Sequence, residues 1–532
     1  MGLLPPEAGA TIANTLWWAR GQQSARRFAR ALRNPREAQW RWLAQALAAN
    51  RDCEYGQRYD FGSIRTANDF ARRVPMVTHD TLTGDIARIQ QGERAVLTTA
   101  PVTHLAPTSG STGPRKLVPF TVSLQHGFSD AVNVWWTDLV RQRPSLLGGP
   151  GYWSVSPLEA PEPPVQAGHV RVGFADDADY LGGTMAWLVR QALAVPSSVR
   201  HAPHMDAFWG LTLTALLRRR GLRMLSVWHP SFIELLREQA ERLWAPLLDA
   251  IATGRPAEWE YALPSQAQLG WSVTPNPARA AELRRVGVHR FDQWWPQLAV
   301  VSAWGDQAAT SGFTQLQKSL EHTAPGVLVQ PKGLLATEGV ITVPYAGTYP
   351  VAATSHWFEF LDDASDVRAL HELVRGEHYE VVLTNGGGLW RYRLGDMVEC
   401  TGTLAATPTL RFLGRAGRNS DLRGEKLSEV FVAEVLRSLW QGGAMPYAVL
   451  AAYDSGEGVG YELRTTAGAV DSLAERCERA LCANPHYALA RRLGQLQPVR
   501  VVSVPHGEGV RALAAHRGRL GDAKPSVLAG IA

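Results

Sequence analysis

The sequence predicts an α/β protein with a large N-terminal domain, in which helices flank β-sheets, and a small α+β C-terminal domain. Three observations support this prediction. The chain has 532 residues, which is too long for one hydrophobic core and suggests two or more domains. Short apolar runs alternate with helical patterns through its middle, which is typical of α/β organisation. Near Gly414 a polar stretch ends this pattern, and a shorter series of helices and strands follows it.

The first expected element is an amphipathic helix over residues 24–50, where Phe28, Leu32 and Leu43 recur at helical spacing. Brief apolar runs then predict short strands. These runs cover residues 95–98, 117–121, 298–304, 327–330 and 380–384, with a helix over 231–243 among them. The tryptophan pairs at 17–18, 135–136 and 294–295 are interpreted as packing residues rather than as a sugar platform.

The C-terminal elements predict the domain boundary. A strand over residues 410–413 precedes the polar stretch 414–425. Further elements follow it: a helix from 428, strands near 449–453 and 461–465, a helix from 471, a strand at 499–504 and a last helical segment before 521. The predicted domains are therefore 1–415 and 416–532, and the second has a common domain size.

Composition excludes several classes of function. No apolar run reaches the roughly 18 residues of a membrane span, and the N-terminus has no secretory-signal pattern. The four cysteines are scattered without a C-x-x-C pair, so no zinc or redox site is indicated. The net charge of +5 comes from dispersed basic residues, which does not favour nucleic-acid binding. We expect a cytoplasmic protein with no membrane, nucleic-acid or obligate protein partner.

The balance of basic residues is unusual. Of 54 basic residues 49 are arginines, and the five lysines are Lys116, Lys318, Lys332, Lys426 and Lys524. We interpret these few lysines as positions where an ammonium group is needed and a guanidinium does not serve. Two of them, Lys116 and Lys524, also lie within sequence motifs.

The strongest local signal is T-S-G-S-T-G-P-R-K over residues 108–116. Two glycines allow a tight turn, successive N–H groups in such a turn form an anion-binding concavity, and Lys116 adds a positive charge. A plain surface loop is the alternative. A Walker A loop is disfavoured, because two residues rather than four separate the glycines, and Leu117 stands where a Mg²⁺-binding hydroxyl is required.

This stretch resembles the phosphate loop of the adenylate-forming superfamily, which includes acyl-CoA synthetases, nonribosomal-peptide adenylation domains and luciferases. Three further stretches occur in that superfamily's order: A-T-E-G at 336–339, Y-R-L-G-D at 392–396 and G-R at 414–415. Leu334 stands where the superfamily usually has an aromatic residue that stacks on adenine, so the adenine platform stays unassigned.

Longer stretches of the sequence resemble the auxin-responsive Gretchen Hagen family of acyl-acid amido synthetases. The phosphate loop is closer to the general superfamily form than to the plant form, so the resemblance is to a bacterial-type member of the family. The similar stretches are GLLATEGVITVP, LWRYRLGDMVE, GRAGRNSDLRGEKLSE, RGRLGDAKPSVL and SVWHPSFIELL. The last lies where this family shapes its acyl pocket, so Trp228, His229 and Phe232 are candidate pocket residues. A helix-packing role is an equally good interpretation of these three.

The resemblance implies the adenylate-forming two-domain architecture and an ATP-dependent ligase. A carboxylic acid would be activated as an acyl-adenylate with release of pyrophosphate, and its acyl group then passed to an amino acid. The implied cofactors are ATP and Mg²⁺. The predicted ATP-binding residues are Ser109, Gly110, Ser111, Thr112, Gly113, Lys116, Thr337, Glu338, Asp396 and Arg415, and the predicted catalytic residues are Lys116, Thr337 and Lys524.

The resemblance also implies a role for each residue. Thr337 would contact the α-phosphate and the acyl carboxylate, and Glu338 would bind Mg²⁺. Asp396 would hold the ribose hydroxyls, and Arg415 would also reach the ribose. Lys524 would bridge carboxylate and α-phosphate when a mobile C-terminal domain swings in. Taken alone, Asp396 is better interpreted as a strand-end residue in a turn after Gly395, and the alternative for Glu338 is a solvated loop carboxylate.

Two alternatives remain at this stage. An acyl-CoA ligase of the same fold would differ only in the second nucleophile, a thiol. A catalytically silent binding protein would have no physical reason to keep Lys116, Glu338, Asp396 and Lys524 together.

Overall fold

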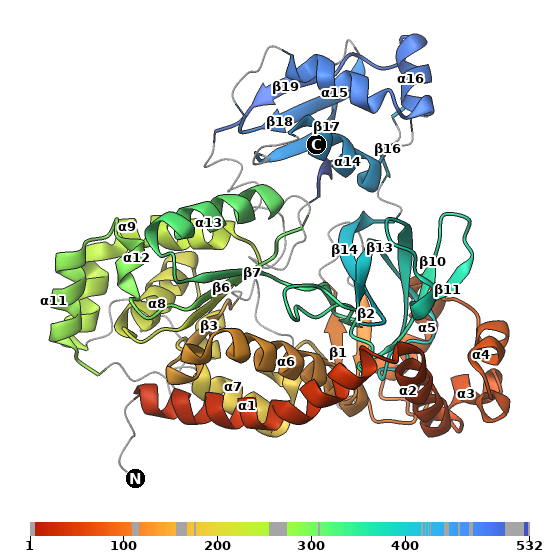
Figure 1. Cartoon of the computed structure of the whole chain (residues 1–532), viewed down its shortest axis with the longest axis horizontal. Helices are drawn as coiled ribbons and strands as arrows, with labels where there is room; N and C mark the ends of the chain where they lie inside the picture. Colours follow the sequence, from red (N-terminus) through yellow and green to blue (C-terminus); the bar gives the residue numbers. More distant parts are fainter. Residues whose placement is uncertain are drawn as a thin grey trace.

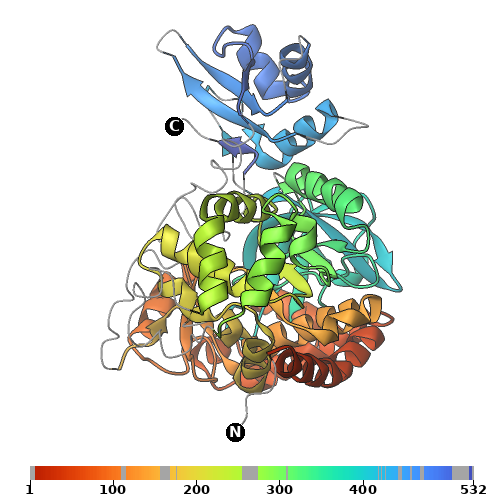
Figure 2. The ribbon, with the colours of Figure 1, turned by 90° about the vertical axis from the view of Figure 1, so that its left-hand side faces the viewer.

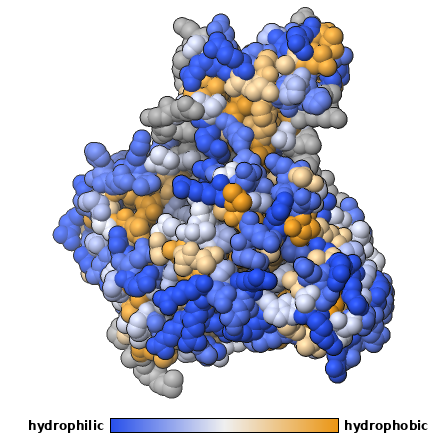
Figure 3. Space-filling model, turned by 45° about the vertical axis from the view of Figure 1, so that its right-hand side comes forward, coloured by the Kyte–Doolittle hydropathy of each residue, from blue (hydrophilic) through white to orange (hydrophobic). Residues whose placement is uncertain are grey.

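The structure is a computed structural model of the whole chain, which Figure 1 shows coloured from residue 1 to 532. It describes residues 6–108, 116–155, 168–174, 177–254, 274–306, 309–416, 419–420, 422–423, 425, 427–440, 446–455, 458–467, 472–505 and 526–529. Within these ranges no helix is long and apolar enough to cross a membrane. Figure 3 shows one face, on which hydrophobic residues form separate groups among hydrophilic ones.

Two helices cover the region where a single helix was predicted over 24–50, so the prediction of one continuous helix is wrong. Helix α1 spans Pro6–Ala31 and helix α2 spans Pro35–Asn50. Asn34 separates them and caps α2, since its side chain accepts a hydrogen bond from the Glu37 N–H. Pro35 takes the first helical position, where its missing N–H is tolerated.

A four-stranded parallel sheet lies at the centre of the large body, in the order β3-β5-β6-β7. Its strands are β3 (Gly151–Trp153), β5 (Met224–Ser226), β6 (Val300–Ala303) and β7 (Leu328–Pro331). Two hydrophobic clusters cover its two faces, as expected for a parallel sheet buried on both sides. The strands predicted over 298–304 and 327–330 are confirmed.

Helices form the outer layers of this sheet (Figure 1). One face carries α1, α6 (Val122–Gln142) and α7 (Gly183–Ala192). The other carries α8 (Met205–Arg218), α9 (Ser231–Thr253), α11 (Pro277–Val286), α12 (Phe291–Trp294) and α13 (Thr310–Thr323). The helix predicted over 231–243 is confirmed as part of α9. The tryptophan pairs do pack inside these layers: Trp17 stacks on Trp136 with ring centroids 4.4 Å apart.

A five-stranded antiparallel sheet lies beside this body, in the order β11-β10-β12-β13-β14. Its strands are β10 (Trp357–Leu361), β11 (Val367–Ala369), β12 (His378–Thr384), β13 (Tyr392–Leu404) and β14 (Thr407–Arg415). Its core also includes the smaller sheet of β1 (His104–Pro107), β2 (Leu117–Phe120) and β4 (Arg171–Val172). Helices α3 (Glu54–Arg58), α4 (Ala67–Arg73) and α5 (His79–Gln90) lie near its edge.

The strand predicted over 95–98 does not form. Ala95 has a φ of 57°, which lies in the left-handed region and breaks an extended conformation. The segment instead accepts backbone hydrogen bonds from the first turn of α3, from Glu54 to Ala95 and from Tyr55 to Val96. The strand before the loop at 108–116 is β1, which pairs with β2 in an antiparallel hairpin.

The C-terminal part has a core of its own, built from residues between Leu427 and Leu528. Its sheet runs β19-β18-β17-β20, with strands β17 (Ala448–Asp454), β18 (Val459–Thr465), β19 (Arg500–Ser503) and β20 (Leu528–Ala529). Helices α14 (Glu429–Leu439), α15 (Leu473–Leu481) and α16 (Pro485–Arg492) pack on it. Figures 1 and 2 show this part standing above the rest of the chain.

Candidate functional site

The A-T-E-G stretch forms a tight hairpin between β8 (Leu335–Ala336) and β9 (Gly339–Val340), with Thr337 and Glu338 at its turn. The Glu338 carbonyl oxygen accepts a 2.7 Å hydrogen bond from Asn385 Nδ2. Glu338 is only 6% exposed, so the interpretation as a solvated loop carboxylate is wrong. Asn385 therefore holds the backbone of this turn, and the Glu338 side chain is buried rather than solvated.

His356 supports this hairpin from behind. The Val340 N–H donates to its Nε2 over 3.2 Å, so the ring is neutral with its proton on Nδ1. Burial lowers the pKa of His356 to about 3, which keeps it neutral throughout the physiological range. A Cβ added to Gly339 would lie 2.6 Å from Nε2, so only glycine permits this approach.

The loop over residues 385–389 joins two of the predicted motifs. Asn385 Oδ1 accepts hydrogen bonds from the N–H groups of Gly387 and Leu389, while its Nδ2 holds the Glu338 carbonyl. The Thr121 hydroxyl, directly after β2, donates to the Gly386 carbonyl over 2.7 Å. A Cβ on Gly387 would overlap the Pro119 carbonyl oxygen in β2. The loop therefore places the Glu338 turn beside the strand that follows the phosphate loop.

Lys116 lies at the base of the phosphate loop and is exposed. Its carbonyl accepts a 2.8 Å hydrogen bond from the Thr108 N–H, which extends the β1–β2 hairpin. The next N–H, of Leu117, donates to His79 Nε2 over 3.2 Å. Burial, and secondarily the charge of Lys116, lowers the pKa of His79. Ser109, Gly110, Ser111, Thr112 and Gly113 lie outside the described residues, as does Lys524.

Asp396 and Arg415 face each other on adjacent antiparallel strands, β13 and β14. Arg415 Nε lies 3.2 Å from Asp396 Oδ1. Asp396 is 0% exposed and stands within β13, so it is not a strand-end residue in a turn. The structure thus brings together the two residues that were predicted, from separate motifs, to contact the ribose.

Tyr392 lies close to charged side chains of the second motif, the third motif and the hinge motif. Burial raises the pKa of its phenol, and the nearby charges of Glu338, Arg415, Asp80 and Asp396 also act on it. Asp80 reaches this place because Val77 pairs with Tyr392: the Val77 N–H donates to the Arg391 carbonyl and the Arg393 N–H to the Val77 carbonyl. The start of α5, with His79 and Asp80, therefore lies beside both Lys116 and the third motif.

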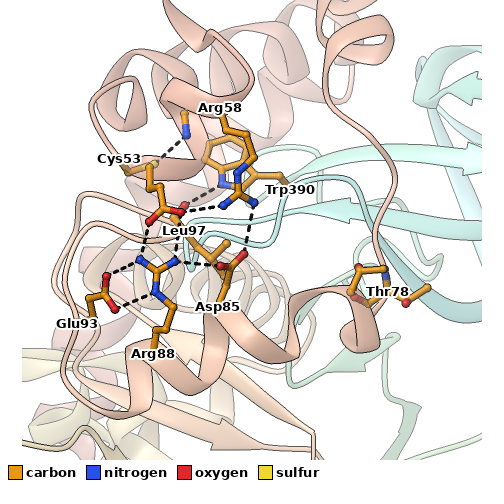
Figure 4. Close-up of polar contacts among 11 residues, drawn as sticks. Cys53, Arg58, Thr78, Asp85, Arg88, Glu93, Leu97 and Trp390 are labelled. Carbon is orange, nitrogen blue, oxygen red and sulfur yellow. Dashed lines mark hydrogen bonds and ion pairs between the residues drawn. The ribbon is translucent and has the colours of Figure 1, made fainter.

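Trp390 anchors the start of the third motif to the N-terminal helices (Figure 4). Its Nε1 donates a 2.9 Å hydrogen bond to the Leu97 carbonyl. Around it Arg88 forms ion pairs with Glu54, Asp85 and Glu93. The Trp390 bond holds the segment before Tyr392 in place, while the Arg88 ion pairs join α3, α5 and the turn after α5, so both roles are structural.

The candidate acyl-pocket residues lie at the carboxyl edge of the parallel sheet, where ligands of such sheets commonly bind. Trp228 follows β5, and its carbonyl accepts a 2.7 Å hydrogen bond from the Trp304 N–H after β6. His229 Nδ1 accepts the Ser231 N–H, while burial lowers the pKa of His229 to about 4. Phe232 lies in the core against Trp209.

Two predicted features, the adenine platform and the metal site, depend on Leu334 and Glu338. Leu334 is 3% exposed and packs in the core, so its side chain offers little surface to an adenine ring. Among the described residues, no group of three or more His, Cys, Asp or Glu side chains is arranged so that it could hold a metal ion. Mg²⁺ commonly uses one or two carboxylates together with substrate phosphates. The enclosed Glu338 carboxylate fits that mode of binding.

Sequence reasoning missed three residues that support the site: His79, Asn385 and His356. Each lies well outside the motif that it supports, and only the fold brings it there. The run of three glycines at 386–388 was an available signal, because such a run indicates close backbone packing.

Comparison with known proteins places this geometry in context. Residues 24–327 match the model of the GH3 family N-terminal domain, and residues 349–415 match that of the GH3 family central domain. A probable indole-3-acetic acid-amido synthetase GH3.12 of Oryza sativa subsp. japonica is 29% identical over 451 residues, which cover 76% of this chain and 72% of the relative.

Two further proteins are similar over most of their length. Jasmonoyl--L-amino acid synthetase JAR4 of Nicotiana attenuata is 24% identical over 394 residues, covering 70% of this chain and 68% of the relative. The solved structure of AtGH3.15 acyl acid amido synthetase in complex with 2,4-DB has a TM-score of 0.77 at 18% identity, covering 99% of this chain and 95% of that one. The predicted α/β fold class is thereby confirmed.

Proposed function

Because the chain belongs to the GH3 family, we propose that it is an acyl-acid amido synthetase, which activates a carboxylic acid with ATP and transfers the acyl group to an amino acid. The observation that carries the proposal is the meeting of three motifs. The Glu338 turn, the Asp396–Arg415 pair and the strand after the phosphate loop adjoin through the 385–389 loop and Tyr392.

The first step needs positive charge and hydrogen-bond donors more than covalent chemistry. A carboxylate oxygen of the acid attacks the α-phosphorus of ATP, a new P–O bond forms, and the bond to the β-phosphate breaks. Acyl-adenylate and pyrophosphate are the products. Because two anions approach each other, the main requirement is positioning and charge stabilisation.

The residues of the site suit the parts of this step. Asp396 can accept hydrogen bonds from the ribose hydroxyls, and Arg415 balances its charge. Lys116 and the hydroxyls of Ser109, Ser111 and Thr112 suit the pyrophosphate, and Thr337 the α-phosphate and acyl carboxylate. Glu338 would hold Mg²⁺, which supplies charge neutralisation at the phosphates when bound.

The second step forms the amide. The nitrogen of the acceptor amine attacks the acyl carbon, the bond from that carbon to the phosphate oxygen breaks, and AMP leaves. The attacking amine gives up a proton. The relatives described above are named for amide formation with amino acids, which favours this step over thioester formation.

We also propose that residues 1–415 and 416–532 act as two domains, the second moving to bring Lys524 to the α-phosphate. A contact near the junction supports this proposal. Glu429, at the start of α14, accepts hydrogen bonds from the Arg415 N–H and from the Ser526 hydroxyl, two residues after Lys524. Ser526, the first described residue after Lys524, is thus tied to the junction.

The experiment that tests the function is pyrophosphate release from ATP against a panel of aryl, indolyl and fatty acids. We expect release that depends on one class of acid. Mass spectrometry of the products with mixed amino acids, and separately with CoA, then identifies the acceptor. An amide product supports the proposal, while a thioester without amide would make the chain an acyl-CoA ligase. No release with any acid would favour a silent binding protein.

A further inference from the structure

Lys332 occupies an unusual position at the carboxyl edge of the parallel sheet. It follows β7 directly and begins the segment that leads to the Thr337–Glu338 turn. Its backbone N–H donates to the Ala303 carbonyl over 2.9 Å, and its Nζ donates to Ser226 Oγ over 2.6 Å. Since β6 lies between β5 and β7, the Lys332 side chain passes over the carboxyl end of β6.

Two serine hydroxyls lie on this face of the sheet. Ser226 and Ser302 are direct partners in the parallel register of β5 and β6, so their side chains are neighbours, about 5 Å apart. Ser302 is 1% exposed, and among the residues described its Oγ has no hydrogen-bond partner. A buried hydroxyl in this state is unfavourable unless a ligand or a water molecule supplies the partner.

The charge of Lys332 is also unmatched. No acidic side chain in the described part of the chain forms an ion pair with it. Its recorded neighbours are the Ser226 hydroxyl and the ring of Trp228, 5.6 Å from Nζ. Burial alone shifts its pKa, down to about 7. A partly enclosed ammonium group without a counter-charge is a receptor for an anion.

The residue type supports the same interpretation. Lysine is rare in this chain, with five against 49 arginines. Three of the five lie among the described residues, and of these Lys116 and Lys318 are exposed while Lys332 is partly buried. A lysine presents a compact point charge with rotatable donors, which a guanidinium does not reproduce in a confined place.

We propose that Lys332, with the hydroxyls of Ser226 and Ser302, binds a carboxylate group of the acid substrate, while the Trp228 ring flanks the hydrocarbon part. An ammonium group and two hydroxyl donors match the acceptor-only chemistry of a carboxylate. This inference rests on the proposed function, whose own test is turnover by the unmodified chain. It assigns Lys332 to binding and positioning of the acid.

The test compares Lys332→Met, Ser302→Ala and the control Lys318→Met, which removes an exposed lysine on α13. The probe is the acid of the panel that the unmodified chain uses best, with acid and ATP varied separately. For Lys332→Met we expect the KM for the acid to rise at least 10-fold, the KM for ATP to stay within twofold, and the Tm not to fall. For Ser302→Ala we expect a smaller rise in the same constant, and for Lys318→Met no change.

Calorimetric titration of the same acid into ATP-free protein gives a readout apart from activity, and its Kd should rise in parallel. A loss shared by all monocarboxylic acids assigns Lys332 to the reacting carboxylate. A loss of binding confined to dicarboxylic acids assigns Lys332 to the second carboxylate of such an acid. An unchanged acid KM in Lys332→Met, in a chain that still releases pyrophosphate, overturns this inference and leaves the proposed function intact. Equal rises in both KM values together with a lower Tm also overturn it, since they indicate a structural role.

Discussion

Asp396 and Arg415 form an ion pair across two neighbouring strands, with Arg415 Nε 3.2 Å from Asp396 Oδ1. The carboxylate is fully buried while the guanidinium is partly exposed. Arg415 is the last residue of β14, and its N–H also donates to Glu429 in the C-terminal part. The pair therefore links the proposed ribose site to the junction between the two proposed domains.

Asp396→Asn tests the ribose contact. Hydrogen bonds to a charged acceptor contribute about 1.5–3 kcal/mol, so we expect the KM for ATP to rise roughly 10- to 100-fold. The KM for the acid should change little. The control is Glu399→Gln on the same strand, whose ion pair with Arg411 lies at the surface and should contribute little. Steady-state kinetics with ATP and acid varied separately decide the matter, and an unchanged ATP constant would contradict the assignment.

Asn385→Ala tests the loop that joins the motifs. The change leaves the Glu338 carbonyl and the N–H groups of Gly387 and Leu389 without their partner, each at about 1–3 kcal/mol. We expect the Tm to fall by several degrees and kcat to fall as well. Asn34→Ala is the control, because it removes the cap of α2, at about 1 kcal/mol, and one exposed hydrogen bond to Glu37, both far from the motifs in the sequence. If both variants lowered Tm but neither changed kcat, the loop would have no part in catalysis.

Gly387→Ala tests the close approach of that loop to β2. A Cβ there would overlap the Pro119 carbonyl oxygen, so the loop or the strand must shift. We expect lower stability, by at least about 1 kcal/mol, and weaker pyrophosphate release. Gly84→Ala is the matched control, because Gly84 is exposed in α5 with no atom near its added Cβ. It should be neutral or more stable by about 0.5–1 kcal/mol. Similar denaturant midpoints for the two variants would refute the packing argument.

The burial of Lys332 should make the stability of the protein depend on pH. The pKa of Lys332 is about 7 in the folded chain and about 10.4 when unfolded. Between these two pKa values the unfolded state binds a proton that the folded state does not. The contribution of Lys332 to the unfolding free energy therefore rises with pH, by about 1.4 kcal/mol per pH unit. Below pH 7 both states are protonated and the contribution is constant. Lys332→Met should remove this slope.

The measurement is the unfolding free energy of both proteins in urea between pH 6 and 9. The unmodified chain should gain stability relative to Lys332→Met only above about pH 7. Parallel curves across the whole range would show that the ammonium group is not buried as described.

Much of the fold and of the site could be predicted from the sequence, because the informative signals were local. The resemblance to the Gretchen Hagen family and the α/β class are confirmed, as are the strands at 298–304 and 327–330. The helix expected over 24–50 failed at Asn34, where an N-cap followed by proline outweighs the apolar periodicity. The strand at 95–98 failed because backbone groups there bond to α3 instead of to a sheet.

The supporting residues of the site could not be found in this way. His79 reaches Leu117 only because Val77 pairs with Tyr392, more than 300 residues further along the chain. Asn385 acts on Glu338 through a side-chain bond to a backbone carbonyl, which no motif records. Lys332 stood out as a rare lysine, but its surroundings depend on the register of three strands.

The most direct test of the central claim is a crystal structure with a bound non-hydrolysable ATP analogue and Mg²⁺. We expect the ribose hydroxyls to lie within hydrogen-bond distance of the Asp396 carboxylate, with the α-phosphate beside Thr337 and the metal on Glu338. A nucleotide bound elsewhere, or one whose ribose lies away from Asp396, would contradict the account.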